Sequence, residues 1–113
     1  MVSITETWLT KDCATSFVDL SGFNFYRGDT DSPVAKHGAG LYVSERFSAH
    51  KVEVSLPNLV AVYIGELDLY ILSVYRPPSY DAEQNGKLAE FLVEFEVGKE
   101  LLVLGDFNLP TVV

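Results

Sequence analysis

The sequence of 113 residues predicts a mixed α/β (α+β) fold, a β-sandwich made mostly of strands with one helix at its side. Several short apolar runs are bounded by turn residues, and two of the longest are separated by only two residues. One segment with an amphipathic helical pattern follows, and after it comes a further apolar run. A composition of 48% hydrophobic and 21% charged residues indicates a packed globular core. These patterns leave the order of the strands open.

The first strands are predicted from short runs that are rich in β-branched and aromatic residues, each bounded by Gly, Asp, Ser or Pro. The fourth run also alternates between apolar and polar residues. Arg27-Gly28-Asp29, which follows the second run, is interpreted as turn and strand-end chemistry. The predicted strands cover residues 2–5, 23–26, 40–43 and 50–55.

A β-hairpin is the clearest local prediction. Residues 59–64 and 67–75 both have the composition of strands, and Gly65 and Glu66 separate them. Gly in the first position of a two-residue loop suits a type II′ turn. The second strand should end before residues 77–78, because two prolines stand there and proline has no N–H for the ladder.

One helix is predicted to begin near Asp81, whose carboxylate can cap the first turn, with Gln84 completing a capping box. Asn85, which is followed by Gly, is a poor helix former and predicts a late start for the regular helix. Gly98 is placed to end the helix, and the chain returns as a buried strand at residues 101–104. The stripe expected to pack against a sheet consists of Leu88, Phe91, Leu92 and Phe95.

The formal net charge is −8, from sixteen acidic and eight basic residues. The summed field of such a chain repels a phosphate backbone, which counts against nucleic-acid binding by the chain alone. Much of the charge lies in residues 81–100, where we interpret it as a solvated helix face. The acidic residues concerned are Glu83, Glu90, Glu94, Glu96 and Glu100.

The sequence predicts an intracellular chain, nuclear or cytoplasmic, that neither crosses a membrane nor is secreted. It has no run of about 18 uncharged apolar residues, as a membrane-spanning helix would need. Its first residues lack the basic and apolar regions of a signal peptide. Cys13 is the only cysteine, which excludes an internal disulfide and leaves no Cys and His cluster at the spacing of a zinc site.

Four short segments, spread from one end of the chain to the other, carry the candidate chemistry. Glu6 and Asp106 each stand where an apolar strand gives way to a loop, the edge at which a sandwich can gather polar groups. Two carboxylates that meet there could hold Mg²⁺, with Mn²⁺ as an alternative, because a hard cation takes oxygen ligands. The segments are residues 4–9 (ITETWL), 37–43 (HGAGLYV), 73–79 (SVYRPPS) and 104–110 (LGDFNLP).

In their order and approximate spacing these segments resemble the endonuclease/exonuclease/phosphatase superfamily, in the form carried by the reverse transcriptase-associated endonuclease domains of non-LTR retrotransposons. The resemblance implies that Glu6 is the metal ligand and that nucleic acid is the substrate. It implies that Asp106 and Asn108 orient water and phosphate, and that Tyr75 contacts a phosphate. Arg76 is a candidate phosphate clamp because its guanidinium is a planar fork of donors.

These candidates also have simpler interpretations. Asp106 and Asn108 point to the same side if the segment after residue 104 stays extended, but both residue types also favour turns. Tyr75 belongs to a predicted strand and is also interpretable as a core residue. A glutamate at a strand end, such as Glu6, is most often merely solvated.

The chain lacks the general base that the superfamily's hydrolysis needs, a histidine in a Ser-Asp-His segment near the end of the domain. His37 and His50 are present, but neither has an adjacent acid. The family's second internal Asp and its leading strand with a metal-proximal Asn are absent too. We therefore expect residues 1–113 to form a truncated domain that covers the first half of the family's domain, or slightly more.

Three functions stay open on the sequence. The first is Mg²⁺-dependent phosphodiester hydrolysis as part of an endonuclease domain, with this chain inactive by itself. The second is a non-catalytic structural or interaction fragment that forms a homodimer through uncovered sheet surface. The third is a phosphoesterase for small phosphorylated molecules, a class that the superfamily also contains.

Overall fold

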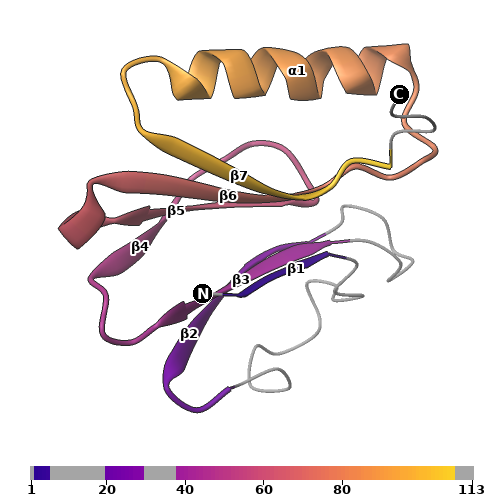
Figure 1. The fold of residues 1–113 in the computed structure, drawn as a ribbon. Helices are drawn as coiled ribbons and strands as arrows, with labels where there is room; N and C mark the ends of the chain where they lie inside the picture. The colour runs from indigo at the N-terminus through magenta and orange to yellow at the C-terminus, as the bar shows by residue number, and fades with distance from the viewer. Residues whose placement is uncertain (1, 6–19, 30–37, 109–113) are drawn as a thin grey trace, which may run out of the picture.

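The computed structural model describes residues 2–5, 20–29 and 38–108. Within these ranges the chain forms two sheets with one α-helix against the outer face of the second sheet (Figure 1). The mixed α/β, strand-dominated class predicted from the sequence is confirmed. No helix in the described ranges has the length and apolar run that a membrane crossing requires.

Sheet A has three strands and sheet B has four. The order in sheet A is β1-β3-β2, with β1 (Val2–Thr5), β2 (Phe23–Gly28) and β3 (Ala39–Ser44). The order in sheet B is β4-β5-β6-β7, with β4 (Ala49–Val52), β5 (Leu59–Ile64), β6 (Leu69–Tyr75) and β7 (Leu101–Asp106).

Neighbouring strands are antiparallel except β6 and β7, which run parallel. The parallel pair arises because α1 (Ala82–Glu96) connects the two strands and returns the chain to the end of the sheet where β6 began. In Figure 1 α1 lies above sheet B and sheet A lies below it, so sheet B is the middle layer.

Two hydrophobic clusters hold the three layers together. Successive side chains on a strand point to opposite faces, so β5 and β6 supply both clusters at once. The buried side chains between the sheets are Leu41, Val43, Val60, Val62, Ile64 and Ile71. Those between sheet B and the helix are Leu59, Ala61, Leu72, Val74 and Leu88, with Phe91, Leu92 and Phe95 packed against them. The predicted helical stripe is therefore confirmed.

The strands agree with the sequence prediction except in their lengths. β1 and β5 have the predicted bounds, whereas β2 and β3 are longer than the predicted runs at residues 23–26 and 40–43. β4 begins one residue early and ends at Val52, so the prediction of a strand through residue 55 is wrong. Residues 53–58 instead form the loop that leads into β5.

The two-residue type II′ loop predicted at Gly65 and Glu66 is also wrong. Ile64 pairs with Leu69 across the hairpin, so four residues connect the strands. Residues Gly65–Leu67 form a 3₁₀ turn in place of the start of the second strand. A four-residue connection of this kind is a common hairpin loop, and it shifts the start of β6 by two residues from the predicted residue 67.

The longer loop is stabilised by Asp68. This residue adopts a left-handed conformation with φ of 47°, which aspartate tolerates, and its N–H donates to the carbonyl of Gly65 at 3.2 Å. The hydroxyl of Tyr63 donates to the Asp68 carboxylate at 2.8 Å, and this hydrogen bond raises the pKa of Tyr63. Leu67, which the sequence placed in a strand, is 54% exposed in the turn.

The capping box predicted for α1 is confirmed. The Asp81 carboxylate accepts from the N–H of Gln84 at 2.9 Å, and the Gln84 side chain accepts from the N–H of Asp81 at 3.0 Å. The prediction of a late start is wrong, because the regular helix runs through Asn85 and the Gly after it. The cap and the packed stripe outweigh a propensity cost of about 1 kcal/mol or less for each residue. Gly98, with φ of 71°, follows the last turn as predicted.

The predicted acidic face is confirmed, since Glu83, Glu90, Glu94 and Glu96 on α1 and Glu100 after it are all exposed. Residues 101–104 form a strand as predicted, but the prediction that this strand is buried is wrong. β7 pairs with β6 on one side, and among the described residues no strand pairs with its other side. Leu102 and Val103 therefore remain 39% and 36% exposed.

Candidate active site

One edge of the sandwich collects the ends of strands from both sheets. In sheet A, Ala39 at the start of β3 pairs with Thr5 at the end of β1 and with Gly28 at the end of β2. In sheet B, the end of β6 pairs with the start of β5 on one side and with the end of β7 on the other, where Tyr75 lies beside Asp106.

Asn58, in the loop before β5, joins the two sheets at this edge. Its N–H donates to the carbonyl of Asp29 just after β2, at 3.1 Å, and its carbonyl accepts from the N–H of Tyr75 at 2.9 Å. It adopts a left-handed conformation with φ of 60° and is 3% exposed. Its side-chain oxygen Oδ1 has no hydrogen-bond partner among the described residues. The sequence prediction did not include Asn58, although an asparagine after a proline is a recognisable turn signal.

Glu6 lies outside the described residues. So do the rest of the first segment after residue 5, His37 at the start of the second, and residues 109–110 at the end of the fourth. The strand that leads to Glu6 is described, however. β1 lies against β6 and β7, and the Ser3 hydroxyl is 2.8 Å from the Ser73 hydroxyl on β6. The residue directly before Glu6, Thr5, therefore ends its strand at the same edge as Tyr75 and Asp106.

Tyr75 and Asp106 are the last residues of two neighbouring parallel strands. The ladder continues one step beyond them, because the N–H of Arg76 donates to the carbonyl of Asp106 at 2.8 Å. Tyr75 is 4% exposed, which agrees with the interpretation of this residue as part of the core.

Asp106 and Asn108 form a turn, which is the second of the two conformations that the sequence left open for them. β7 ends at Asp106, and Asn108 is left-handed with φ of 48°. The Asp106 Oδ1 accepts from the N–H of Asn108 at 2.9 Å, an Asx turn that closes the loop locally. Oδ2 of Asp106 has no partner among the described residues, and a carboxylate oxygen of this kind fits a Mg²⁺ ligand.

Arg76 is engaged by this turn and by α1. Its Nε donates to Oδ1 of Asn85 at 2.7 Å, and its Nη1 donates to the carbonyls of Phe107 and Asn108 at 3.0 and 3.3 Å. The side-chain amide of Asn108 donates in return to the carbonyl of Arg76 at 2.8 Å. Two of the three guanidinium nitrogens are thus occupied, and Nη2 has no partner among the described residues.

Of the two histidines the structure describes His50, which does not lie at this edge. His50 pairs with Tyr63 in the β4–β5 ladder, and their rings lie 5.4 Å apart. Tyr63 lies toward the opposite end of β5 from Leu59, the residue that begins the strand at the candidate site. In the described part of the chain, no three His, Cys, Asp or Glu residues are grouped closely enough to hold a metal ion.

A cleft of about 260 Å³ lies beside Tyr75, between α1 and the loop before β5. Val74 and Leu88 form part of its apolar lining, and Tyr80 and Lys87 also line it. A second and larger cleft, of about 560 Å³, lies at the edges of β2 and β4 and includes none of the predicted site residues.

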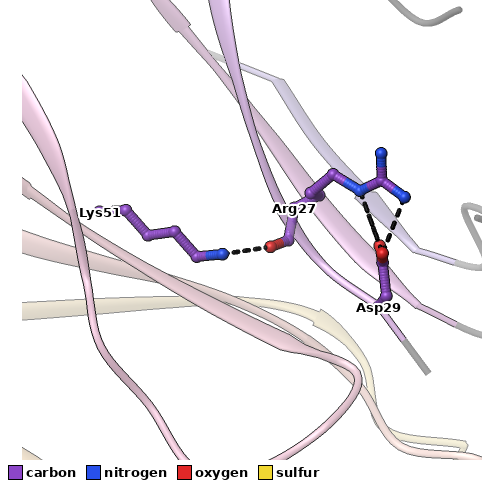
Figure 2. A network of polar contacts seen from close by, with 3 residues as sticks. All are labelled: Arg27, Asp29 and Lys51. Atoms are coloured by element: carbon purple, nitrogen blue, oxygen red, sulfur yellow. Dashed lines mark hydrogen bonds and ion pairs between the residues drawn. The ribbon is translucent and has the colours of Figure 1, made fainter. Parts of the chain in front are cut away.

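In the larger cleft Arg27 and Asp29 form an ion pair, and Lys51 bonds to the backbone beside them. Asp29 accepts from Nε and Nη2 of Arg27 at 2.9 and 2.7 Å, and Nζ of Lys51 donates to the Arg27 carbonyl at 2.8 Å (Figure 2). Figure 2 shows the Arg27 side chain turned toward Asp29 and Lys51 reaching the backbone from the other side. Arg27-Gly28-Asp29 therefore acts as strand-end structure, as the sequence suggested.

Comparison of the chain with protein-family models and with curated proteins finds no match. The candidate site consequently rests on the chain's own residues. Its described part is a strand edge at which Tyr75, Asp106 and Asn108 are held close together, with Arg76 bonded to the last of these and to α1.

Proposed function

We propose that the chain contributes part of the active site of a Mg²⁺-dependent phosphodiesterase or endonuclease domain of the retroelement type. One observation carries the proposal: Tyr75, Asp106 and Asn108 meet at the edge where β1 ends, immediately before Glu6. Residues that are far apart in the sequence and that resemble one superfamily's site thus converge on one side of the sandwich.

Each described side chain is assigned a role that its contacts permit. Glu6 is proposed as the metal ligand, and a bound Mg²⁺ would polarise a phosphoryl oxygen and stabilise the leaving group. Asp106, with Oδ2 unpaired among the described residues, orients water. The Asn108 amide nitrogen donates to the Arg76 carbonyl, and its oxygen, which has no partner among the described residues, is proposed to assist Asp106. Tyr75 and Nη2 of Arg76 are proposed to contact phosphate.

The chain alone is proposed to be inactive, because no general base is supplied by the described residues at this edge. Removing such a base costs roughly two to four orders of magnitude in rate. The net charge of −8 further weakens binding to a nucleic acid. A metal site without efficient hydrolysis is the expected behaviour.

Calorimetric titration of the chain with Mg²⁺ tests the metal site. We expect Glu6→Ala or Asp106→Ala to weaken Mg²⁺ binding about tenfold or more, because each change removes a charged oxygen ligand. Glu90→Ala is the matched control, since it makes the same change at an exposed position on α1. Equal Mg²⁺ affinities in all three variants and the unchanged chain would contradict the proposed site.

Nicking of supercoiled plasmid distinguishes an inactive part of a site from a complete one. With Mg²⁺ present we expect no nicking above the level in EDTA. Nicking that disappears in EDTA, in Glu6→Ala and in Asp106→Ala would instead show that the chain assembles a complete active site.

A second candidate function is a non-catalytic interaction fragment that forms a homodimer through β7. The observation that favours it is the open side of β7, where Leu102 and Val103 are more than a third exposed and no charged residue interrupts positions 101–105. Such an edge lacks the lysines and prolines that commonly block strand pairing.

Analytical ultracentrifugation tests this candidate. We expect the chain to sediment as a dimer at micromolar concentration and Leu102→Lys to shift it to a monomer, because a charge on the edge strand opposes pairing. Leu67→Lys is the control, as Leu67 is 54% exposed and belongs to the β5–β6 loop, not to β7. A monomeric unchanged chain would rule the dimer out.

A further inference from the structure

Asn85 contradicts the local preferences of its helix. It lies in the first turns of α1 and is followed by Gly86, and both residue types are less favourable in a helix than Ala, by up to about 1 kcal/mol each. A Cβ on Gly86 would meet nothing within 4 Å, so packing does not require this glycine. Positions at which a sequence departs from local preference often have a functional reason, and the side chain of Asn85 supplies one.

Asn85 supports Arg76 from a rigid base. The start of α1 is held by the capping box, and the N–H of Asn85 itself donates to the carbonyl of Asp81 at 2.9 Å. Leu88, on the next turn, is 8% exposed against sheet B. The amide oxygen of Asn85 is thus fixed where it accepts from Nε of Arg76 at 2.7 Å, a distance that is short for a nitrogen donor.

The turn after β7 needs such support. β7 pairs with β6 on one side, and the described residues place no strand on the other. The ladder reaches its last bond where the N–H of Arg76 donates to Asp106. Beyond it, Phe107 and Asn108 are held to the rest of the sheet by Nη1 of Arg76 and by the bond from the Asn108 amide to the Arg76 carbonyl.

We propose that Arg76 and Asn85 are a pair of positioning residues, which hold the Asp106–Asn108 turn in the conformation that the proposed metal and phosphate site requires. The inference rests on the proposed function for its role in the site. Arg76 acts through Nε and Nη1 as a structural bridge from α1 to the turn, and Asn85 fixes the orientation of its guanidinium.

Hydrogen exchange at the Asn108 backbone amide tests the pair. We expect Asn85→Ala to speed this exchange about tenfold, the effect of losing one hydrogen bond to a charged group, with the amides of β5 unchanged. Asn85→Asp keeps an oxygen acceptor for Arg76 and should restore the slow rate. Gly86→Ala is the matched control, because it also raises helix propensity but does not touch Arg76.

Mg²⁺ affinity of the same variants separates a positioning role from a purely structural one. We expect Asn85→Ala to weaken Mg²⁺ binding several-fold and Asn85→Asp to restore it. An exchange rate at Asn108 that stays unchanged in Asn85→Ala would overturn the pair. Faster exchange with unaltered Mg²⁺ affinity would overturn its role in the site. If the unchanged chain binds no Mg²⁺, the proposed function fails and so does that role, while the exchange rates still decide whether the pair exists.

Discussion

Gly105→Ala should lower the free energy of unfolding by about 3 kcal/mol or more, a large part of the stability of a small domain. Gly105 has φ of 146°, a backbone conformation that residues other than glycine rarely adopt. A Cβ at this position would lie 1.9 Å from the carbonyl oxygen of Val74 on the neighbouring strand β6. Because a backbone atom cannot move aside without breaking the β6–β7 ladder, β7 and the Asp106 turn should detach together.

Urea unfolding monitored by circular dichroism measures the effect, and two other glycines separate its causes. Gly22→Ala shares the positive φ but meets nothing within 4 Å, so it should cost about 1–2 kcal/mol. Gly86→Ala has neither strain nor a close neighbour and should stabilise the chain by about 0.5–1 kcal/mol. A Gly105→Ala chain that unfolds at the same urea concentration as Gly22→Ala would show that no backbone contact exists at Gly105.

Gly28→Ala should cost about 3 kcal/mol by forcing the two sheets apart. Gly28 ends β2 in sheet A, and a Cβ there would lie 2.0 Å from the carbonyl oxygen of Leu59 and 2.4 Å from its carbonyl carbon, in sheet B. The backbones of the two sheets thus approach each other closely at the candidate site. The first bond to weaken should be that from the N–H of Asn58 to the carbonyl of Asp29.

Hydrogen exchange at the amides of Asn58 and Tyr75, together with urea unfolding, measures this change. Both amides should exchange faster in Gly28→Ala, because both bonds depend on the position of the loop between the sheets. Gly65→Ala is the control, since its new Cβ would meet Ser48 at an ordinary contact distance of 3.6 Å. Unchanged stability and exchange in Gly28→Ala would mean that β2 does not pass over Leu59 at this distance.

Local features of the fold were predictable where neighbouring residues in the sequence decide them. The capping box depends on Asp81 and Gln84, and the stripe from Leu88 to Phe95 on helical spacing alone. The strand at residues 59–64 is apolar along its whole length because it is central in a sheet with a layer on each face. Such signals are complete within one segment.

Predictions failed where a choice depended on distant contacts. The alternation around Leu67 and Asp68 equally fits a strand, and the register with β5 decided for a longer loop. The apolar residues at 101–104 predicted a buried strand. Burial also depends on neighbouring elements, and among the described residues β7 has a paired strand on one side only. The residue types at Asp106 and Asn108 suit both an extended segment and a turn, so the sequence could not decide between these conformations.

In the candidate site, too, some features were predictable from the sequence and others depended on distant contacts. The identities and order of Glu6, Tyr75, Asp106 and Asn108 were enough to suggest the chemistry, and Glu6 lies outside the described residues. The sequence proposed Arg76 as a phosphate clamp, but its bonds to Asn85 and to the turn after β7 emerge only when α1 packs on sheet B. Asn58 was missed because its backbone bonds to Asp29 and Tyr75 join segments from different sheets.

By itself, then, the sequence determined the strand-dominated α/β class, the capped amphipathic helix and the set of polar residues at strand ends. It could do so because propensity, periodicity and capping act between residues that are close in the chain. The tertiary structure alone decided which strand ends share an edge, which side chains are buried and which polar groups bond to one another. Those outcomes depend on sheet register and on the close approach of backbones at Gly28 and Gly105, and they couple residues tens of positions apart.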